Sequence, residues 1–128
     1  MTHQPSGIVV AVVDDDPSIL QSLEYLLESA DFAVRLFTSG TALLDSDCLP
    51  EIQCLISDID MPGIDGFELL RRVHAVRPGL PIILITGYPE TLQRLPTLGG
   101  TNPRLFTKPF QGPELLAAIS ESLRQPAG

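Results

Sequence analysis

The chain alternates between short apolar runs and longer stretches with a helical repeat. The first apolar run, Ile8–Val13, is a continuous series of mostly β-branched residues, which is typical of a strand buried on both faces. Asp16 and Pro17 follow, and this pair predicts the start of a helix, with Asp16 as N-cap and Pro17 in the first turn. Apolar residues then recur at spacings of three and four, which predicts one buried helix face: Ile19, Leu20, Leu23, Leu26, Leu27 and Ala30.

The same alternation continues to the end of the chain. We predict further strands at Ala33–Phe37, Cys54–Ser57, Pro81–Ile85 and Arg104–Thr107, and helices at Ser39–Leu44, Asp65–Ala75 and Pro113–Arg124. Strands that alternate with helices indicate right-handed crossovers and a parallel sheet that is covered on both faces. Five such units predict an α/β fold of the flavodoxin-like type, a single-domain (βα)5 three-layer sandwich with the parallel strand order 2-1-3-4-5.

One segment departs from the helical pattern. Residues Tyr88–Pro103, where a fourth helix would lie, contain three prolines and two glycines. Both residue types disfavour a helix interior. We therefore predict an irregular or shortened fourth helix, with helical turns from about Pro89 to Leu95 at most.

Length and charge limit the organisation and the partners of the chain. At 128 residues it has room for one domain, which we place at residues 8–124, after a loose lead-in at 1–7 and before a tail at 125–128. A net charge of −8 argues against nucleic acid or a membrane as partner, since both repel an acidic surface. Cys48 and Cys54 lie in no metal-ligand spacing, and no signal peptide is visible, so we expect a cytoplasmic protein.

Chemically reactive residues stand at the ends of the predicted strands. Asp14 and Asp15 follow the first strand, Asp58 the third, Thr86 the fourth and Lys108 the fifth. The carboxyl ends of parallel strands meet at one edge of the sheet, where ligands bind in such folds. Clustered carboxylates repel one another, and a hard divalent cation such as Mg²⁺ is the natural counter-ion for oxygen ligands. Carboxylates, a metal, a hydroxyl and a lysine are a set of parts for phosphoryl transfer, with a carboxylate oxygen as nucleophile.

Four sequence motifs contain or adjoin these residues: Val12–Asp16 (VVDDD), Ser57–Gly66 (SDIDMPGIDG), Ile85–Gly87 (ITG) and Lys108–Phe110 (KPF). Together they resemble the response-regulator receiver domains of two-component signal transduction. The resemblance extends over nearly the whole chain, and the motifs occur in the order that the family has. Gly66 also suits a turn or a close approach of backbones ahead of the third helix, where a side chain would be unfavourable.

The resemblance implies a role for each residue of the site. Asp58 would accept the phosphoryl group, while Thr86 and Lys108 would each bind a phosphoryl oxygen. The implied Mg²⁺ ligands are four aspartates: Asp58, Asp15 as a direct ligand, Asp14 mainly through water, and Asp60 through its backbone carbonyl. The Lys108–Pro109 peptide bond would be cis, as in the family.

By this resemblance the chain is a phosphoacceptor signalling domain. A sensor histidine kinase or a histidine phosphotransfer protein would donate the phosphoryl group, and a change of conformation would control a downstream protein or an attached output domain. The domain would catalyse only its own phosphorylation and dephosphorylation. Neither the output partner nor a phosphorylation-dependent dimer is decided by the sequence.

Three positions depart from the common family pattern. Asp60 adds a negative charge two residues after Asp58, and Tyr88 places a bulky group two residues after Thr86. Leu105 stands where many relatives carry an aromatic residue, which puts the usual output surface in question. We hypothesise that phosphorylation instead changes the order or the docking of residues 88–103.

Two alternative functions come from other classes. A pseudo-receiver, which is an interaction module without phosphorylation, would be favoured if the acceptor, a metal carboxylate or the lysine were missing. A haloacid-dehalogenase-like phosphatase also uses an Asp-x-Asp motif such as Asp58–Asp60. Those enzymes generally need a longer chain and a Thr or Val after one intervening residue, whereas here Met61 and Pro62 follow.

Overall fold

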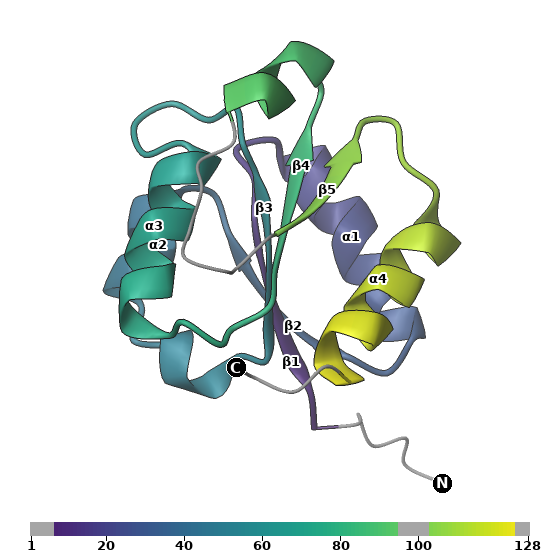
Figure 1. Ribbon diagram of the computed structural model, residues 1–128. Coiled ribbons are helices and arrows are strands. Elements are labelled where there is room, and N and C mark those ends of the chain that lie inside the picture. Colours follow the sequence, from purple (N-terminus) through teal and green to yellow (C-terminus); the bar gives the residue numbers. More distant parts are fainter. Residues whose placement is uncertain (1–6, 95–102, 125–128) are drawn as a thin grey trace, which may run out of the picture.

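A five-stranded parallel sheet forms the centre of the computed structural model, which describes residues 7–94 and 103–124 (Figure 1). The strand order β2-β1-β3-β4-β5 is the predicted one. The observed strand ends differ from the predicted ones by at most one residue. The strands are β1 (Val9–Val13), β2 (Ala33–Phe37), β3 (Cys54–Asp58), β4 (Ile82–Thr86) and β5 (Arg104–Thr107).

Four α-helices cover the sheet within the described part of the chain. They are α1 (Pro17–Ser29), α2 (Gly40–Asp45), α3 (Gly66–Val76) and α4 (Gly112–Arg124). Helices α1 and α4 lie on one face and α2 and α3 on the other, which confirms the three-layer sandwich (Figure 1). None of the helices in residues 7–94 and 103–124 combines the length and the apolar content that crossing a membrane requires.

The helices begin where capping residues allow them to begin. Asp16 is the N-cap of α1, as predicted, and Ser39 is that of α2. Each side chain accepts a hydrogen bond from a backbone N–H of the first turn. Asp65 caps α3 in the same way, so the helix starts one residue later than predicted. These caps fix the start of each helix close to the carboxyl end of the preceding strand.

The central strands are buried on both faces. All residues of β3 and β4 are buried, as are the last four of β1. Because successive side chains of a strand point to opposite faces, each of these strands contributes side chains to two apolar clusters, one on each face of the sheet. Ala11 and Leu55 pack with α2 and α3, whereas Val10 and Ile56 pack with α1 and α4. The apolar runs of the sequence therefore form the core, which fixes the positions of the strands.

Residues Pro89–Arg94, between β4 and β5, form a 3₁₀-helix, η2, and not an α-helix. A second 3₁₀-helix, η1 (Leu49–Glu51), precedes β3. The shortened fourth helix is thus confirmed in residues 89–94, where proline at the start and a short length favour 3₁₀ turns. The rest of the predicted irregular segment (95–102), most of the lead-in (1–6) and the tail (125–128) lie outside the described residues.

Both cysteines are buried and form no disulfide. Burial raises the pKa of the Cys54 thiol in β3 to about 12, so the thiol is neutral at physiological pH. Neutral thiols are poor nucleophiles and poor metal ligands. Cys54 therefore acts as an apolar residue of its strand, and Cys48 lies buried at the start of η1.

Candidate functional site

The register of the sheet brings the strand-end residues together. Asp58, the last residue of β3, pairs with Ile85 of β4, one residue before Thr86. In the same way Thr86 pairs with Thr107, the last residue of β5, which precedes Lys108. Because parallel strands end at the same edge, this register places the functional groups of three strands side by side.

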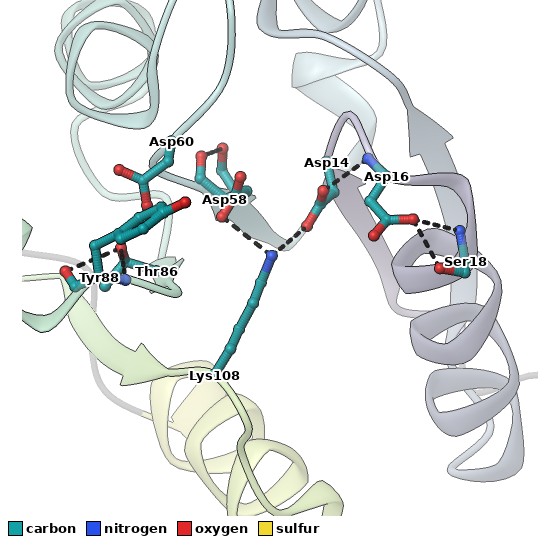
Figure 2. Close-up of polar contacts among 9 residues, drawn as sticks. Asp14, Asp16, Ser18, Asp58, Asp60, Thr86, Tyr88 and Lys108 are labelled. Atoms are coloured by element: carbon teal, nitrogen blue, oxygen red, sulfur yellow. Dashed lines mark hydrogen bonds and ion pairs between the residues drawn. The ribbon is translucent and has the colours of Figure 1, made fainter.

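Asp14, Asp15 and Asp58 form an acidic pocket at the ends of β1 and β3. One carboxylate oxygen of each residue lies within 4.8 Å of the others. Asp14 and Asp58 are buried, whereas Asp15 is exposed. Lys108 reaches between the two buried carboxylates, with its Nζ 3.3 Å from Oδ2 of Asp14 and 3.4 Å from Oδ1 of Asp58 (Figure 2). The implied cis bond between Lys108 and Pro109 is present.

Burial and mutual repulsion make this pocket unfavourable for negative charge. Burial is the main reason why the pKa of Asp58 rises to about 6, and the neighbouring Asp14 adds to the rise against the opposing effect of Lys108. Burial also raises the pKa of Asp14, although the backbone N–H of Asp16 and the Lys108 ammonium oppose it. Burial alone would lower the pKa of Lys108, but the two carboxylates outweigh it and raise that pKa. One ammonium group therefore faces three carboxylates and leaves the pocket short of positive charge.

The oxygen atoms of the acidic pocket fit a hard divalent cation. Oδ1 of Asp58 is buried and accepts no hydrogen bond from the described residues, with the Lys108 ammonium as its neighbour at ion-pair distance. A buried carboxylate oxygen without a donor is unfavourable unless a cation or a proton satisfies it. Mg²⁺ binds a few carboxylate oxygens in proteins and keeps several waters. The positions of Asp14, Asp15 and Asp58 are therefore compatible with a Mg²⁺ site.

Asp60 and Thr86 form a second cluster, beside the acidic pocket. Thr86 is fully buried, and its hydroxyl donates to Oδ2 of Asp60 at 2.5 Å and accepts from the backbone N–H of Tyr88 at 3.0 Å (Figure 2). The hydroxyl of Thr91, in η2, donates to Oδ1 of Asp60 at 3.3 Å. We name Asp60, Thr86 and Thr91 the threonine clamp.

The threonine clamp was only partly visible in the sequence. Asp60 and Thr86 were predicted site residues, but not as partners of each other, and Thr91 was not predicted at all. Nothing in the sequence around Thr91 distinguishes it from any polar residue of a loop. The proposed metal contact of Asp60 through its backbone carbonyl stays a prediction.

Gly66 lies where the start of α3 meets the end of β3. A Cβ atom at this position would lie 2.7 Å from the carbonyl oxygen of Asp58 and 2.7 Å from Cα of Ile59. The backbone N–H of Gly66 also donates to the carbonyl of Ile59 at 2.9 Å. The start of α3 thus packs directly on the end of β3, which confirms the predicted close approach.

Tyr88 and Leu105 are the two other departures from the family pattern. Tyr88 lies next to the threonine clamp, and Leu105 lies on β5. Tyr88 is 58% exposed and stands beside Thr86 (Figure 2). Leu105 is half-buried and packs with the α2 and α3 cluster, whereas Phe106 packs on the opposite face against Phe110. The aromatic residue of β5 therefore lies on the other face of the sheet from Leu105.

Comparison with known sequences places the chain in a family. Residues 10–120 match the family model of the response regulator receiver domain. The transcriptional regulatory protein FixJ of Bradyrhizobium diazoefficiens is 37% identical over 118 residues, which cover 91% of this chain and 57% of FixJ. The C4-dicarboxylate transport transcriptional regulatory protein DctD of Pseudomonas aeruginosa is 35% identical over 89% of this chain and 25% of its own length. The chain thus spans little more than half the length of FixJ and a quarter of DctD.

Solved structures agree with the sequence comparison. The response regulator StyR superposes with a TM-score of 0.79 and 33% identity, over 93% of this chain and 60% of StyR. The signal receiver domain of an HD domain-containing protein from Pseudomonas fluorescens Pf-5 superposes with a TM-score of 0.80 and 31% identity, over 94% and 95% of the two chains. With the strand order, the acidic pocket and the lysine in place, the chain belongs to the response regulator receiver domains of two-component systems.

Proposed function

We propose that this chain is a Mg²⁺-dependent phosphoacceptor, in which Asp58 takes the phosphoryl group and the fold changes conformation in response. One observation carries the proposal: a buried oxygen of Asp58 accepts no hydrogen bond from the described residues, faces Lys108, and lies beside two further carboxylates. Such an arrangement is unfavourable by itself. It becomes favourable when a cation balances the carboxylates and a charged group is transferred between that cation and the lysine.

The transfer is a displacement at phosphorus. An oxygen of the ionised Asp58 carboxylate forms a bond to phosphorus, while the bond from phosphorus to the donor atom breaks and its electron pair stays with the leaving group. The leaving group is the ring nitrogen of a phosphohistidine or the acetate oxygen of acetyl phosphate. Lys108 is positioned to bind a phosphoryl oxygen and to offset its charge. Mg²⁺ bound to Asp14 and Asp15 would supply the remaining positive charge.

The switch would begin with the new charge on Asp58. An acyl phosphate carries roughly −1.5 to −2 charges near neutral pH. Two groups that can donate to it are the Lys108 ammonium and the Thr86 hydroxyl, which stands at the end of the neighbouring strand. We propose that movement of these two groups toward the phosphoryl oxygens starts the conformational change.

We further propose that the phosphoryl donor is a sensor histidine kinase or a histidine phosphotransfer protein, because the chain belongs to a two-component family. In this proposal the domain catalyses only its own phosphorylation and dephosphorylation. FixJ and DctD are named as transcriptional regulatory proteins, which supports an output domain or a partner protein as the receiver of the signal. A direct contact of this chain with nucleic acid is not proposed, since its net charge is −8. The cytoplasmic location stays a prediction.

The pseudo-receiver is the rival that this proposal must exclude. It would be favoured by a missing acceptor, metal carboxylate or lysine, and all of these residues are present and adjacent. No observation favours a haloacid-dehalogenase-like phosphatase.

Intact-mass spectrometry after incubation with acetyl phosphate tests the proposal. With Mg²⁺ we expect one phosphoryl adduct, which hydroxylamine removes because it is an acyl phosphate, and which peptide mapping assigns to Asp58. With EDTA the adduct should be absent. A hydroxylamine-resistant adduct, an adduct on another residue, or no adduct from either acetyl phosphate or a histidine kinase would contradict the proposed function.

A further inference from the structure

Thr86 has a single proton to donate, and Asp60 accepts it. A threonine hydroxyl carries one donor hydrogen and two acceptor lone pairs. At Thr86 the hydrogen points to Oδ2 of Asp60 at 2.5 Å, with the carbonyl of Tyr88 as a longer contact at 3.3 Å. One lone pair accepts the backbone N–H of Tyr88. The single proton of the Thr86 hydroxyl is therefore already committed in the structure.

A phosphoryl oxygen on Asp58 would need the same proton. Phosphoryl oxygens of an ionised acyl phosphate only accept hydrogen bonds, so Thr86 can bind one only by withdrawing its hydrogen from Asp60. The two bonds exclude each other. The bond to Asp60 joins a fully buried hydroxyl to a carboxylate oxygen, and hydrogen bonds to a carboxylate are strong where water is excluded.

We propose that the Asp60 carboxylate competes with the phosphoryl group for Thr86 and so holds the unphosphorylated state. Its displacement releases Thr91 and with it η2. This inference rests on the proposed function of Asp58, and it adds a residue that sets the balance between the two states. Asp60 thus acts through its side chain, in addition to any metal contact of its backbone.

The link to η2 runs through the second oxygen of Asp60. Oδ1 accepts the hydroxyl of Thr91, whose backbone N–H in turn donates to the carbonyl of Tyr88 at 2.9 Å. When Thr86 turns to the phosphoryl group, Asp60 loses its shorter hydrogen bond and meets a new negative charge two residues away. Both effects favour movement of its carboxylate toward water, which leaves Thr91 without its acceptor. The start of the irregular segment therefore senses the state of Asp58.

Beryllofluoride binding measures this competition. Beryllium trifluoride attaches to a carboxylate with Mg²⁺ and imitates the phosphoryl group without hydrolysis. We expect Asp60→Ala to bind it about tenfold more tightly than wild type, which corresponds to about 1.4 kcal/mol. Part of any gain is a general effect of removing a negative charge, and Glu90→Gln, which removes an exposed carboxylate on η2, measures how large that general effect is.

A double-mutant cycle with Thr86 separates competition from charge. In a Thr86→Ala background no proton is contested, so Asp60→Ala should improve binding only by the effect of its charge, about two- to threefold. Thr86→Ser keeps the hydroxyl and should restore the full effect. Equal effects of Asp60→Ala in the wild-type and Thr86→Ala backgrounds would overturn the competition. If no variant, including wild type, bound beryllofluoride, the proposed function itself would fail, so the two failures are distinguishable.

Hydrogen exchange of the protein without beryllofluoride tests the link to η2. In Asp60→Ala, and in the milder Asp60→Asn if the first variant folds poorly, the amide of Thr91 should exchange several times faster, while amides of β1 and β3 keep their protection. In Glu90→Gln the Thr91 amide should exchange at the wild-type rate. An unchanged Thr91 amide in the Asp60 variants would overturn the link.

Discussion

The carboxylates of Asp58 and Asp60 differ in their hydrogen bonds. In the acidic pocket, a buried oxygen of Asp58 accepts no hydrogen bond from the described residues. In the threonine clamp, each oxygen of Asp60 accepts a hydrogen bond from a threonine hydroxyl. The two residues stand two positions apart in the chain. Asp58 ends the buried strand β3, and its side chain meets Asp14 and Lys108. Asp60 lies in the loop that follows, turned toward β4 and η2.

The difference indicates that the acidic pocket is the reactive region and that the threonine clamp restrains the structure. Buried polar groups in proteins are nearly always hydrogen-bonded, and an exception calls for an explanation such as a catalytic role or a bound ion. In the acidic pocket, the buried oxygen without a hydrogen bond belongs to Asp58, where a cation and a phosphoryl group are expected. The threonine clamp is complete without a ligand, so it can stabilise only the state in which it forms. The four predictions below test this contrast, from the largest expected effect to the smallest.

The largest contrast concerns phosphorylation itself. Asp58→Asn keeps the size of the side chain but removes the nucleophilic carboxylate, so labelling by acetyl phosphate and Mg²⁺ should be abolished. Asp60→Asn makes the same chemical change two residues away and should still be labelled. Mass spectrometry of the two variants side by side decides the matter. Labelling that survives in Asp58→Asn, or that disappears in Asp60→Asn, would contradict the division between the two regions.

Opposite effects on stability are expected from the same two substitutions. Because the pKa of Asp58 is raised to about 6 in the fold, the folded state holds the Asp58 proton more tightly than the unfolded state does. The stability that this proton contributes is present at low pH and is lost as the pH rises through about 6. Without Mg²⁺ at neutral pH, Asp58→Asn should therefore raise the free energy of unfolding, by about 3 kcal/mol at most.

Urea denaturation in EDTA at several pH values measures this effect. The gain from Asp58→Asn should shrink as the pH falls below about 6. Asp60→Asn should instead lower the free energy of unfolding by about 1 kcal/mol, because it weakens two hydrogen bonds of the clamp. The same sign for both variants at neutral pH would show that the two carboxylates are not held differently.

Gly66→Ala tests the backbone contact between the start of α3 and the end of β3. The added Cβ would meet backbone atoms of Asp58 and Ile59 at 2.7 Å, and backbone cannot yield as a flexible side chain can. We expect a loss of about 2 kcal/mol in the free energy of unfolding, together with slower labelling. Gly87→Ala is the matched control, because a Cβ there meets no atom within 4 Å. A Gly66→Ala variant as stable as Gly87→Ala would contradict the close approach.

Mg²⁺ affinity gives the smallest of the four contrasts. Asp15→Ala should weaken Mg²⁺ binding about tenfold, or about 1.4 kcal/mol, because it removes a direct oxygen ligand. Asp14→Ala should weaken it less, and Asp60→Asn least, since only the backbone of Asp60 is expected at the metal. A Mg²⁺ titration followed by thermal melting reports the three affinities by mass action. Equal affinity in wild type and Asp15→Ala would remove Asp15 from the site.

The strand ends and their reactive residues were predictable because their signals are local. A buried strand reads as a continuous apolar run, and a helix start reads as a capping residue followed by a periodic stripe. The residue that follows each strand can then be assigned to one edge of a parallel sheet. Asp14, Asp58, Thr86 and Lys108 were found in this way, and the structure brings them to that edge.

The partners of these residues were decided only by the tertiary structure. Thr86 meets Asp60 across 26 positions and Thr91 meets Asp60 across 31 positions, and no short-range pattern links such residues. Which carboxylate stays without a donor depends on how the loops after β3 and β4 approach each other, since hydrogen bonds need atoms within about 3 Å. The sequence by itself therefore determined the fold and the groups at the sheet edge. The tertiary structure decided that one oxygen of Asp58 accepts no hydrogen bond from the described residues, whereas both oxygens of Asp60 accept one. Only packing sets the distances between loops on which this difference depends.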